Sequence, residues 1–163
     1  MKIFYLAFIA LSMLALVSCN SISAKNYSED IVKMERSLTP DMEKTENQIA
    51  SFATSEKFDS VAAVAGRMEA IVDSKLQEVI KKEAPKVKEG QNFKEAAVRY
   101  FAYIKSIYTG YKVVGLSKTD EERRSNFAQF QQLAEKKKSV SSEMMKAQEK
   151  YAKANGFKID PSK

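Results

Sequence analysis

Apolar residues recur at spacings of three and four along four stretches of the chain, which is the period of one face of an α-helix. The first stretch runs from about residue 28 to 54, and the second from about residue 57 to 82. The third begins near residue 92 and the fourth near residue 119. No stretch shows the strict alternation of a half-buried strand, so the pattern predicts an all-helical protein.

The spacing assigns one buried face to each helix. In the first helix the face consists of Ile31, Met34, Leu38, Met42, Thr45, Ile49 and Phe52. In the second it consists of Phe58, Val61, Ala65, Met68, Val72, Leu76 and Val79. In the third it consists of Phe93, Ala97, Tyr100, Ile104, Ile107, Tyr111 and Val114. In the fourth it consists of Phe130, Leu133, Val140, Met144, Ala147, Tyr151 and Ala154, interrupted by Lys137.

Capping and turn residues mark the predicted helix ends. Asn92, followed by Glu95, predicts the start of the third helix, and Thr119-Asp120-Glu121-Glu122 forms a capping box at the start of the fourth. Asn155-Gly156 predicts its end, because glycine readily adopts the left-handed conformation. Thr39-Pro40 either kinks the first helix or splits it in two. We favour a kink, because the apolar face keeps its phase across the proline.

Four amphipathic helices joined by short loops predict an antiparallel up-down-up-down four-helix bundle with a long C-terminal helix. The bundle would be a single domain covering residues 27–163. At about 35 residues and 1.5 Å per residue, the fourth helix would be roughly 50 Å long. We expect it to extend beyond the other helices at one end.

Residues 1–18 have the plan of a secretory signal peptide. Lys2 supplies a positive charge, and Ile3–Val17 is an apolar run interrupted only by Ser12. At about 15 residues this run is shorter than the roughly 20 residues that a membrane-spanning helix needs. A permanent transmembrane anchor is therefore the weaker interpretation.

The apolar run ends in Leu16-Val17-Ser18-Cys19, which resembles the lipobox of bacterial lipoproteins. The resemblance implies cleavage before Cys19 and attachment of a diacylglycerol to its thiol, with acyl chains such as palmitate. Two or three acyl chains anchor a protein stably, whereas one chain binds a membrane only marginally. The alternative is a cysteine inside an ordinary cleaved leader.

The residues after Cys19 extend this expectation. Residues 19–26 are polar and aperiodic, and we expect them to form a flexible, lipidated tether. In the lipoproteins that the lipobox resembles, aspartate after the cysteine favours retention in the inner membrane. Asn20 therefore favours the outer membrane of the bacterial envelope, with the periplasmic and the surface face both open.

Composition restricts the chemistry. The leader holds one of the 27 basic residues, so the mature chain carries 26 basic and 21 acidic side chains, a net charge of +5. The chain has no histidine, and its single cysteine is the predicted lipid attachment point. A Ser-His-Asp triad, a histidine-ligated metal and a cysteine-rich zinc site are therefore excluded. We expect a protein that is not an enzyme and binds no cofactor or metal.

Several side chains are candidates for binding. Tyr103 and Tyr108 lie off the apolar face of the third helix, so they are the candidates for an exposed partner-binding surface. Two groups of lysines could meet anionic lipid, lipopolysaccharide or polysaccharide, or could simply form solvated faces. These groups are Lys136, Lys137 and Lys138, and Lys81, Lys82, Lys86 and Lys88. A carboxylate metal site at Glu43, Glu46, Glu69 and Asp73 is disfavoured, because a di-iron bundle also needs histidines.

Three short segments of the mature chain resemble a family of small helical surface lipoproteins of unknown function from spirochaetes and Bacteroidetes. They are residues 27–32 (YSEDIV), 93–97 (FKEAA) and 147–152 (AQEKYA). At the position of Tyr151 that family tends to have phenylalanine. The resemblance implies a helical surface lipoprotein and brings no activity or site residues.

The sequence therefore predicts a membrane-tethered, non-enzymatic binding or structural lipoprotein, monomeric or weakly dimeric. Its partner would be an envelope protein or a glycan, and not nucleic acid. The alternative is a carrier that holds a small apolar ligand or lipid between its helices. A cavity among Tyr100, Ile104 and Met144 would favour the carrier. A filled core with an exposed patch at Tyr103 and Tyr108 would favour the binding module.

Overall fold

A computed structural model describes the backbone of residues 2–159 and the side chains of residues 21–159. It contains the helices α1 (Lys2–Thr54), α2 (Phe58–Lys81), α3 (Gly90–Leu116), α4 (Asp120–Ala134) and α5 (Lys137–Ala154). No strand occurs within residues 2–159, so the all-α class is confirmed. All side chains of the predicted leader, and that of Cys19, lie outside the described side chains.

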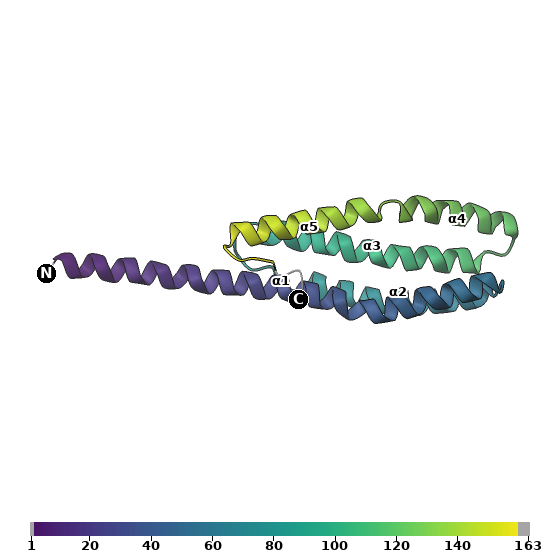
Figure 1. Ribbon diagram of the computed structural model, residues 1–163, viewed down its shortest axis with the longest axis horizontal. Coiled ribbons are helices and arrows are strands. Elements are labelled where there is room, and N and C mark those ends of the chain that lie inside the picture. Colours follow the sequence, from purple (N-terminus) through teal and green to yellow (C-terminus); the bar gives the residue numbers. More distant parts are fainter. Residues whose placement is uncertain (1, 160–163) are drawn as a thin grey trace.

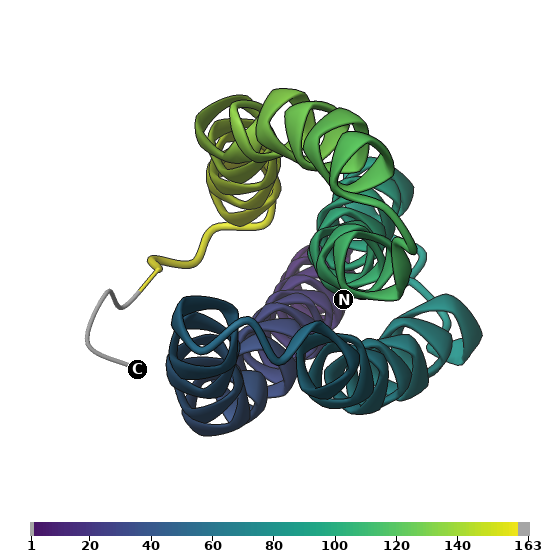
Figure 2. The same cartoon turned by 90° about the vertical axis from the view of Figure 1, so that its right-hand side faces the viewer.

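The helices run up and down in chain order, with α4 and α5 together forming the fourth arm of the bundle (Figure 1). Arms that follow one another in the chain pack together, so that α2 contacts both α1 and α3, and α3 contacts α4 and α5. The α2–α3 contact is the most extensive. Viewed end-on, the arms form an arc whose open side lies between α1 and α4 (Figure 2). α1 and α5 meet near Ser28, whose hydroxyl accepts a hydrogen bond from the Gln148 side chain at 3.0 Å. The bundle topology is confirmed, but α1 and α4 do not pack closely.

The predicted faces of the first two helices are confirmed. Ile31, Leu38, Thr45 and Ile49 of α1 are buried, and so are all the positions predicted in α2 from Val61 to Val79. Across the α2–α3 contact, Glu69 accepts hydrogen bonds from Thr109 (2.6 Å) and Lys112 (2.9 Å). These two contacts lower the pKa of the Glu69 carboxyl.

The face of α3 is rotated relative to the prediction in its second half. Phe101 and Tyr108 are fully buried, whereas the predicted core residues Tyr100, Ile107 and Tyr111 are only half-buried. The prediction of Tyr108 as an exposed residue was therefore wrong. The physical reason is that α3 packs on α2 on one side and on α4 and α5 on the other. A helix enclosed from two sides buries a wider stripe than one row of residues.

The start of α3 also differs from the prediction. The helix begins at Gly90, and the residue before it, Glu89, has a left-handed backbone conformation with φ of 61°. Asn92 lies inside the first turn, where its amide donates to Glu89 Oε2 at 2.7 Å. Asn92 is therefore not the N-cap, and the observed N-cap, Glu89, lies three residues earlier.

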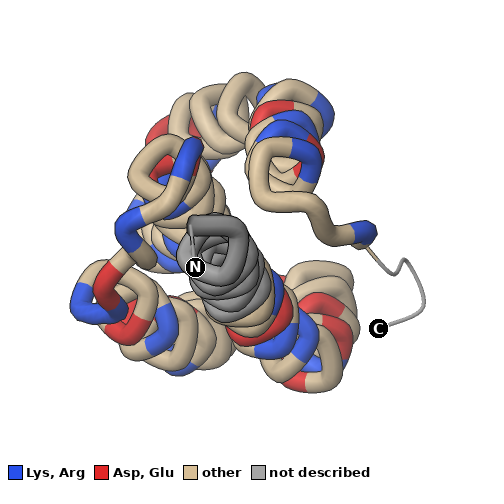
Figure 3. Tube along the Cα trace, turned by 90° about the vertical axis from the view of Figure 1, so that its left-hand side faces the viewer, with Lys and Arg blue, Asp and Glu red and all other residues tan. Residues whose placement is uncertain are grey.

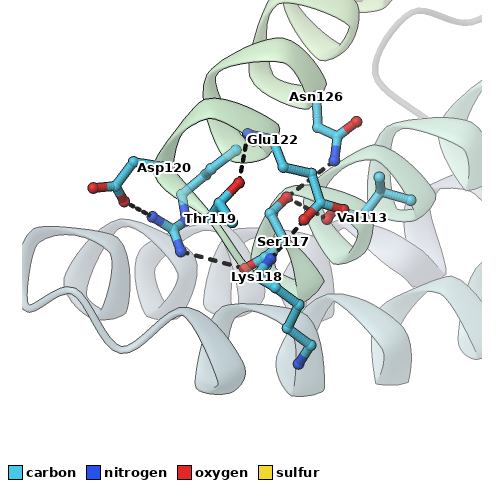
Figure 4. Close-up of polar contacts among 8 residues, drawn as sticks. Val113, Ser117, Lys118, Thr119, Asp120, Glu122 and Asn126 are labelled. Atoms are coloured by element: carbon cyan, nitrogen blue, oxygen red, sulfur yellow. Dashed lines mark hydrogen bonds and ion pairs between the residues drawn. The ribbon is translucent and has the colours of Figure 1, made fainter.

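The N-cap predicted at Thr119 is confirmed at the start of α4, but the return bond of the capping box goes to the amide of Lys118, one residue before the N-cap (Figure 4). The Glu122 amide donates to Thr119 Oγ1 at 3.1 Å, and Glu122 Oε2 accepts from the Lys118 amide at 2.8 Å. Ser117 Oγ accepts from the Asn126 side chain at 3.0 Å and donates to the Val113 carbonyl at 3.2 Å. These bonds fix the turn between α3 and α4, because they satisfy groups that a helix end leaves open.

The long fourth helix is broken at residues 135–136, between α4 and α5. The Tyr103 hydroxyl contacts the carbonyl oxygens of Leu133 and Ala134, each at 3.3 Å. The break therefore exposes carbonyls of the last turn of α4 that a side chain of α3 satisfies. The segment that extends farthest beyond the other arms is the amino-terminal part of α1 and not the fourth arm (Figure 1).

The first helix is continuous across Pro40, so the split that we left open beside a kink does not occur. Residues 19–26 are helical too, in place of the aperiodic tether that we expected. Ala24 and Tyr27 are buried against the core, so packing extends the helix beyond what its polar sequence favours.

The C-terminal end of α5 closes as predicted. Gly156 has φ of 70°, and the Phe157 amide donates to the Ala152 carbonyl at 3.1 Å. This is the bonding pattern of a Schellman cap. Phe157 then folds back on the core, with its ring edge-on to Tyr151 at 5.7 Å between centroids.

Removing the hydroxyl of Tyr151 should not weaken the fold. Tyr151 is fully buried and stacks on Phe93 at 5.0 Å, but its hydroxyl has no hydrogen-bond partner among the described residues. An unsatisfied buried hydroxyl costs free energy, so Tyr151→Phe should leave the unfolding free energy unchanged or raise it by about 1 kcal/mol.

Tyr100→Phe is the matched control, because the Tyr100 hydroxyl donates to Glu35 Oε1 at 2.5 Å. Losing that bond should lower the unfolding free energy by about 1–2 kcal/mol. Urea unfolding followed by circular dichroism measures both variants. A loss of stability in Tyr151→Phe as large as that in Tyr100→Phe would contradict the expectation.

Candidate ligand-binding groove

Three cavities follow one another along the open side of the bundle, between α1 and the arm formed by α4 and α5. Their volumes are about 650, 320 and 370 Å³. The first two share Glu35 and Thr39 as wall residues, and the second and third share Tyr111. We call this row of cavities the groove, and its parts the basal, middle and distal cavities, starting from the end where the amino-terminal part of α1 leaves the bundle.

The middle cavity is lined by four tyrosines of α3, together with Ile104, Ile107 and Phe130. The tyrosines are Tyr100, Tyr103, Tyr108 and Tyr111. Their rings give the cavity an amphipathic wall, because tyrosine combines a large apolar ring with a polar hydroxyl.

Two carboxylates of α1 meet these tyrosines across the groove. Tyr100 donates to Glu35 at 2.5 Å, and the Tyr108 hydroxyl lies 3.4 Å from Glu46. Burial, reinforced by the neighbouring carboxylate, raises the pKa of both tyrosine hydroxyls above the usual value. Both phenols therefore stay protonated at neutral pH and act as donors, which links α3 to α1 along the groove.

The residues that we predicted as an exposed partner-binding surface lie in this cavity wall. Tyr108 is fully buried, and Tyr103 is half-buried with its hydroxyl engaged at the α4–α5 break. The expected exposed patch is therefore absent from the described surface. The two tyrosines are brought together with Tyr100 and Tyr111, which the sequence assigned to the core.

The distal cavity lies where α4 begins. Its wall includes Ile49, Phe58, Val61 and Phe127, and Phe127 is 46 % exposed. The guanidinium of Arg123 stacks over the Phe58 ring at 3.7 Å and forms an ion pair with Asp120 at 2.5 Å. The cation is thus held at the cavity edge by an aromatic face and a carboxylate.

The basal cavity is the largest of the three. Val32, Met145, Phe157 and Ile159 supply its apolar wall, and Met145 is 60 % exposed. Charged side chains surround this wall: Lys25, Glu29, Lys33, Glu35, Arg36 and Lys158. The cavity therefore combines an apolar floor with a charged rim, which suits a molecule that has one apolar and one polar part.

A cavity among Tyr100, Ile104 and Met144 was the feature that would favour a carrier, and the middle cavity matches it in part. Tyr100 and Ile104 line the middle cavity, but Met144 is buried in the core and does not line it. Glu35 and Thr39, which join two of the cavities, were not identified from the sequence. Both lie beside the apolar face of α1, and their spacing of four places them on one side of the helix.

The remaining charged residues that the sequence singled out lie in separate parts of the bundle. Lys136, Lys137 and Lys138 lie at the α4–α5 break, whereas Lys81, Lys82, Lys86 and Lys88 lie at or beyond the end of α2. Asp73 forms an ion pair with Lys105 at 2.8 Å, and Glu69 forms one with Lys112 at 2.9 Å. Within the described side chains, no group of three or more acidic, histidine or cysteine residues could hold a metal ion. No helix in that same part of the chain is long and apolar enough to cross a membrane.

Comparison with protein-family models, with curated proteins and with solved structures gave no significant match. The resemblance to helical surface lipoproteins therefore stays a prediction from short segments of sequence. The groove has to be interpreted from its own chemistry.

Proposed function

We propose that this protein is a non-enzymatic lipoprotein of the bacterial envelope that holds the apolar chain of a lipid in the groove between α1 and α4–α5. The lipid on Cys19 would keep it at the membrane, with the outer membrane as the favoured location. The observation that carries the proposal is the row of three adjoining cavities with apolar and tyrosine walls.

The dimensions of the groove favour an extended apolar chain as its ligand. Each cavity is at least 320 Å³, which is within the range of small-molecule sites. Because neighbouring cavities share Glu35, Thr39 and Tyr111, one long molecule could occupy more than one of them. The charged rim of the basal cavity and the tyrosine hydroxyls supply partners for a polar headgroup.

A protein or glycan partner is less well supported. That idea depended on an exposed surface at Tyr103 and Tyr108, and Tyr108 is buried. Catalysis has little support as well. The groove holds carboxylates and protonated tyrosines, but no histidine or cysteine of the described chain accompanies them to form a nucleophile and base pair.

A single bulky residue at the junction of two cavities should block the ligand. Thr39 lines both the basal and the middle cavity and is exposed on α1. Thr39→Phe should weaken binding of a fluorescent fatty-acyl probe by about tenfold or more, because the ring occupies the passage and overpacking is costly. Titration of the purified protein with the probe, followed by fluorescence, measures the dissociation constant.

Ser37→Phe is the matched control. Ser37 is exposed on the same helix two residues away and lines none of the three cavities. It adds the same apolar ring to the surface, so it should leave probe binding within about twofold, as surface changes usually do. Equal affinity in Thr39→Phe and Ser37→Phe would argue against the groove as the binding site.

A further inference from the structure

At one end of the bundle, basic residues outnumber acidic residues. This basal end consists of residues 21–33 of α1, residues 81–95 around the α2–α3 loop, and residues 146–158 of α5 and its extension. The three segments are in contact. Lys82 pairs with Asp30 at 2.6 Å, Lys150 pairs with Glu89 at 3.1 Å, and Asn155 donates to the Lys88 carbonyl at 2.9 Å.

The basal end accounts for the whole net charge of the described side chains. Its three segments contain eleven basic and six acidic residues, and the rest of residues 21–159 contains fourteen of each. The surplus of five positive charges therefore lies at one end of an otherwise balanced molecule. Figure 3 looks onto this end, where lysine and arginine positions recur along the segments, with acidic positions between them. Such separation creates a directed positive potential.

The surplus positive charge is carried by exposed lysines that form no ion pair among the described residues. The exposed lysines of the basal end that take part in none of the ion pairs among the described residues include Lys81, Lys86, Lys88, Lys153 and Lys158. These side chains can meet an anionic surface without first breaking a contact within the protein. By contrast, the cations of the α2–α3 contact, Lys105 and Lys112, are already paired with Asp73 and Glu69.

A hollow of about 660 Å³ opens at the same end, between α1 and the α2–α3 loop. Its wall includes Lys82 and Lys86, the carboxylates Asp30 and Glu83, and Ile22, which is 58 % exposed. Lys82 is paired with Asp30, whereas Lys86 takes part in no ion pair among the described residues. A free amine and an exposed aliphatic side chain on one wall suit the boundary between lipid headgroups and acyl chains.

We propose that the basal end docks onto anionic phospholipid headgroups and holds the bundle upright on the membrane to which Cys19 anchors it. The docking rests on the proposed anchor, because α1 runs from the basal end toward Cys19. It goes beyond the proposed function by fixing the orientation of the groove, with the basal cavity next to the bilayer. A lipid chain then has a short path from the membrane into the groove.

The orientation can be measured on the mature, lipidated full chain reconstituted in vesicles. Acylation blocks the thiol of Cys19, so an introduced cysteine is the single site for a fluorophore. Gln91→Cys places the fluorophore at the basal end, and Ser125→Cys places it on α4 at the other end; both positions are exposed. A quencher attached to lipid headgroups reports how close each site lies to the membrane.

We expect headgroup quenching at residue 91 to be about threefold stronger on vesicles containing phosphatidylglycerol than on phosphatidylcholine alone. High salt should abolish the difference, because it screens exposed charges. Residue 125 should be quenched weakly on both. Because each basic residue near an anionic surface strengthens binding by roughly fivefold, Lys81→Gln with Lys86→Gln and Lys88→Gln should remove the difference.

Lys136→Gln with Lys137→Gln and Lys138→Gln is the matched control, since it removes the same charge at the α4–α5 break. It should keep the difference between the two vesicles. Equal quenching of residue 91 on neutral and anionic vesicles would overturn the docking surface, and so would equal effects of the two triple variants. Failure to float with neutral vesicles would show instead that the anchor is wrong, and the docking proposal would fall with it.

Discussion

Cys19→Ser should abolish incorporation of a fatty-acid label into this protein in bacterial cells. In the proposed lipidation the Cys19 thiol would be the nucleophile that accepts the diacylglycerol, and a serine hydroxyl is a much weaker nucleophile at neutral pH. The unmodified chain should also keep residues 1–18, so it should migrate as a larger species. Metabolic labelling with an alkyne fatty acid, followed by gel electrophoresis, measures both effects.

Ser18→Ala is the control for this experiment. It keeps a small residue before the cysteine, so labelling and cleavage should continue. Labelled Cys19→Ser protein would show that the acyl chains are attached elsewhere, and the interpretation of the lipobox would be wrong. Unlabelled wild-type protein would have the same consequence.

Gly115→Ala should destabilise the bundle strongly, although alanine favours helix formation. Gly115 is buried where α3 crosses α2, and a Cβ atom there would lie 2.6 Å from the Ala62 amide nitrogen and 2.7 Å from the Phe58 carbonyl oxygen. Both neighbours are backbone atoms of α2, so they cannot rotate away. The two helices would have to separate, and we expect a loss of about 3 kcal/mol, the upper part of the range for overpacking.

Gly66→Ala, in the same pair of helices, should instead stabilise the protein. A Cβ atom at Gly66 would have only the flexible Lys112 side chain nearby, at 3.6 Å. With no clash, the higher helix propensity of alanine should raise the unfolding free energy by about 0.5–1 kcal/mol. Thermal unfolding of both variants measures the difference. A stable Gly115→Ala protein would contradict the close approach of α2 and α3.

The periodicity of the sequence predicts the buried face of α1, and in α2 it predicts part of the buried surface. Val64 of α2 is buried outside the predicted row, because α2 packs on both α1 and α3. Leu38 and Met68 are buried as their spacing indicates. For α3 the same reasoning fails at Phe101 and Tyr108, because helices on both sides bury it. Spacing along one helix carries no information about how many neighbours that helix will have.

The break between α4 and α5 was missed because its neighbourhood holds no proline or glycine. Glu135 and Lys136 favour helix on their own. The break is accommodated by Tyr103, which is 30 residues away in sequence from Leu133 and bonds to its carbonyl. Lys137, the one polar residue in the predicted apolar face of the fourth helix, lies directly after this break.

The groove could not be predicted from the sequence, because it exists only where α1 and α4 do not pack against each other. The apolar pattern of a helix does not show which other helices it leaves uncontacted. The sequence places Tyr100 and Tyr111 on the apolar face of the third helix and Tyr103 and Tyr108 off it. This spacing does not distinguish a cavity wall from an exposed patch. Glu35 and Glu46 appear in the sequence as ordinary polar positions of α1. Only the arc of helices brings them opposite Tyr100 and Tyr108.

Native mass spectrometry of the mature full chain, released gently from membranes, tests the central proposal most directly. We expect a non-covalent adduct with the mass of one lipid. It should be present in wild type and in Ser37→Phe and absent from Thr39→Phe. Collisional activation should remove this adduct and leave the covalent acyl chains on Cys19 in place. An adduct of equal abundance in Thr39→Phe, or no adduct in any of the three proteins, would contradict a lipid-binding groove.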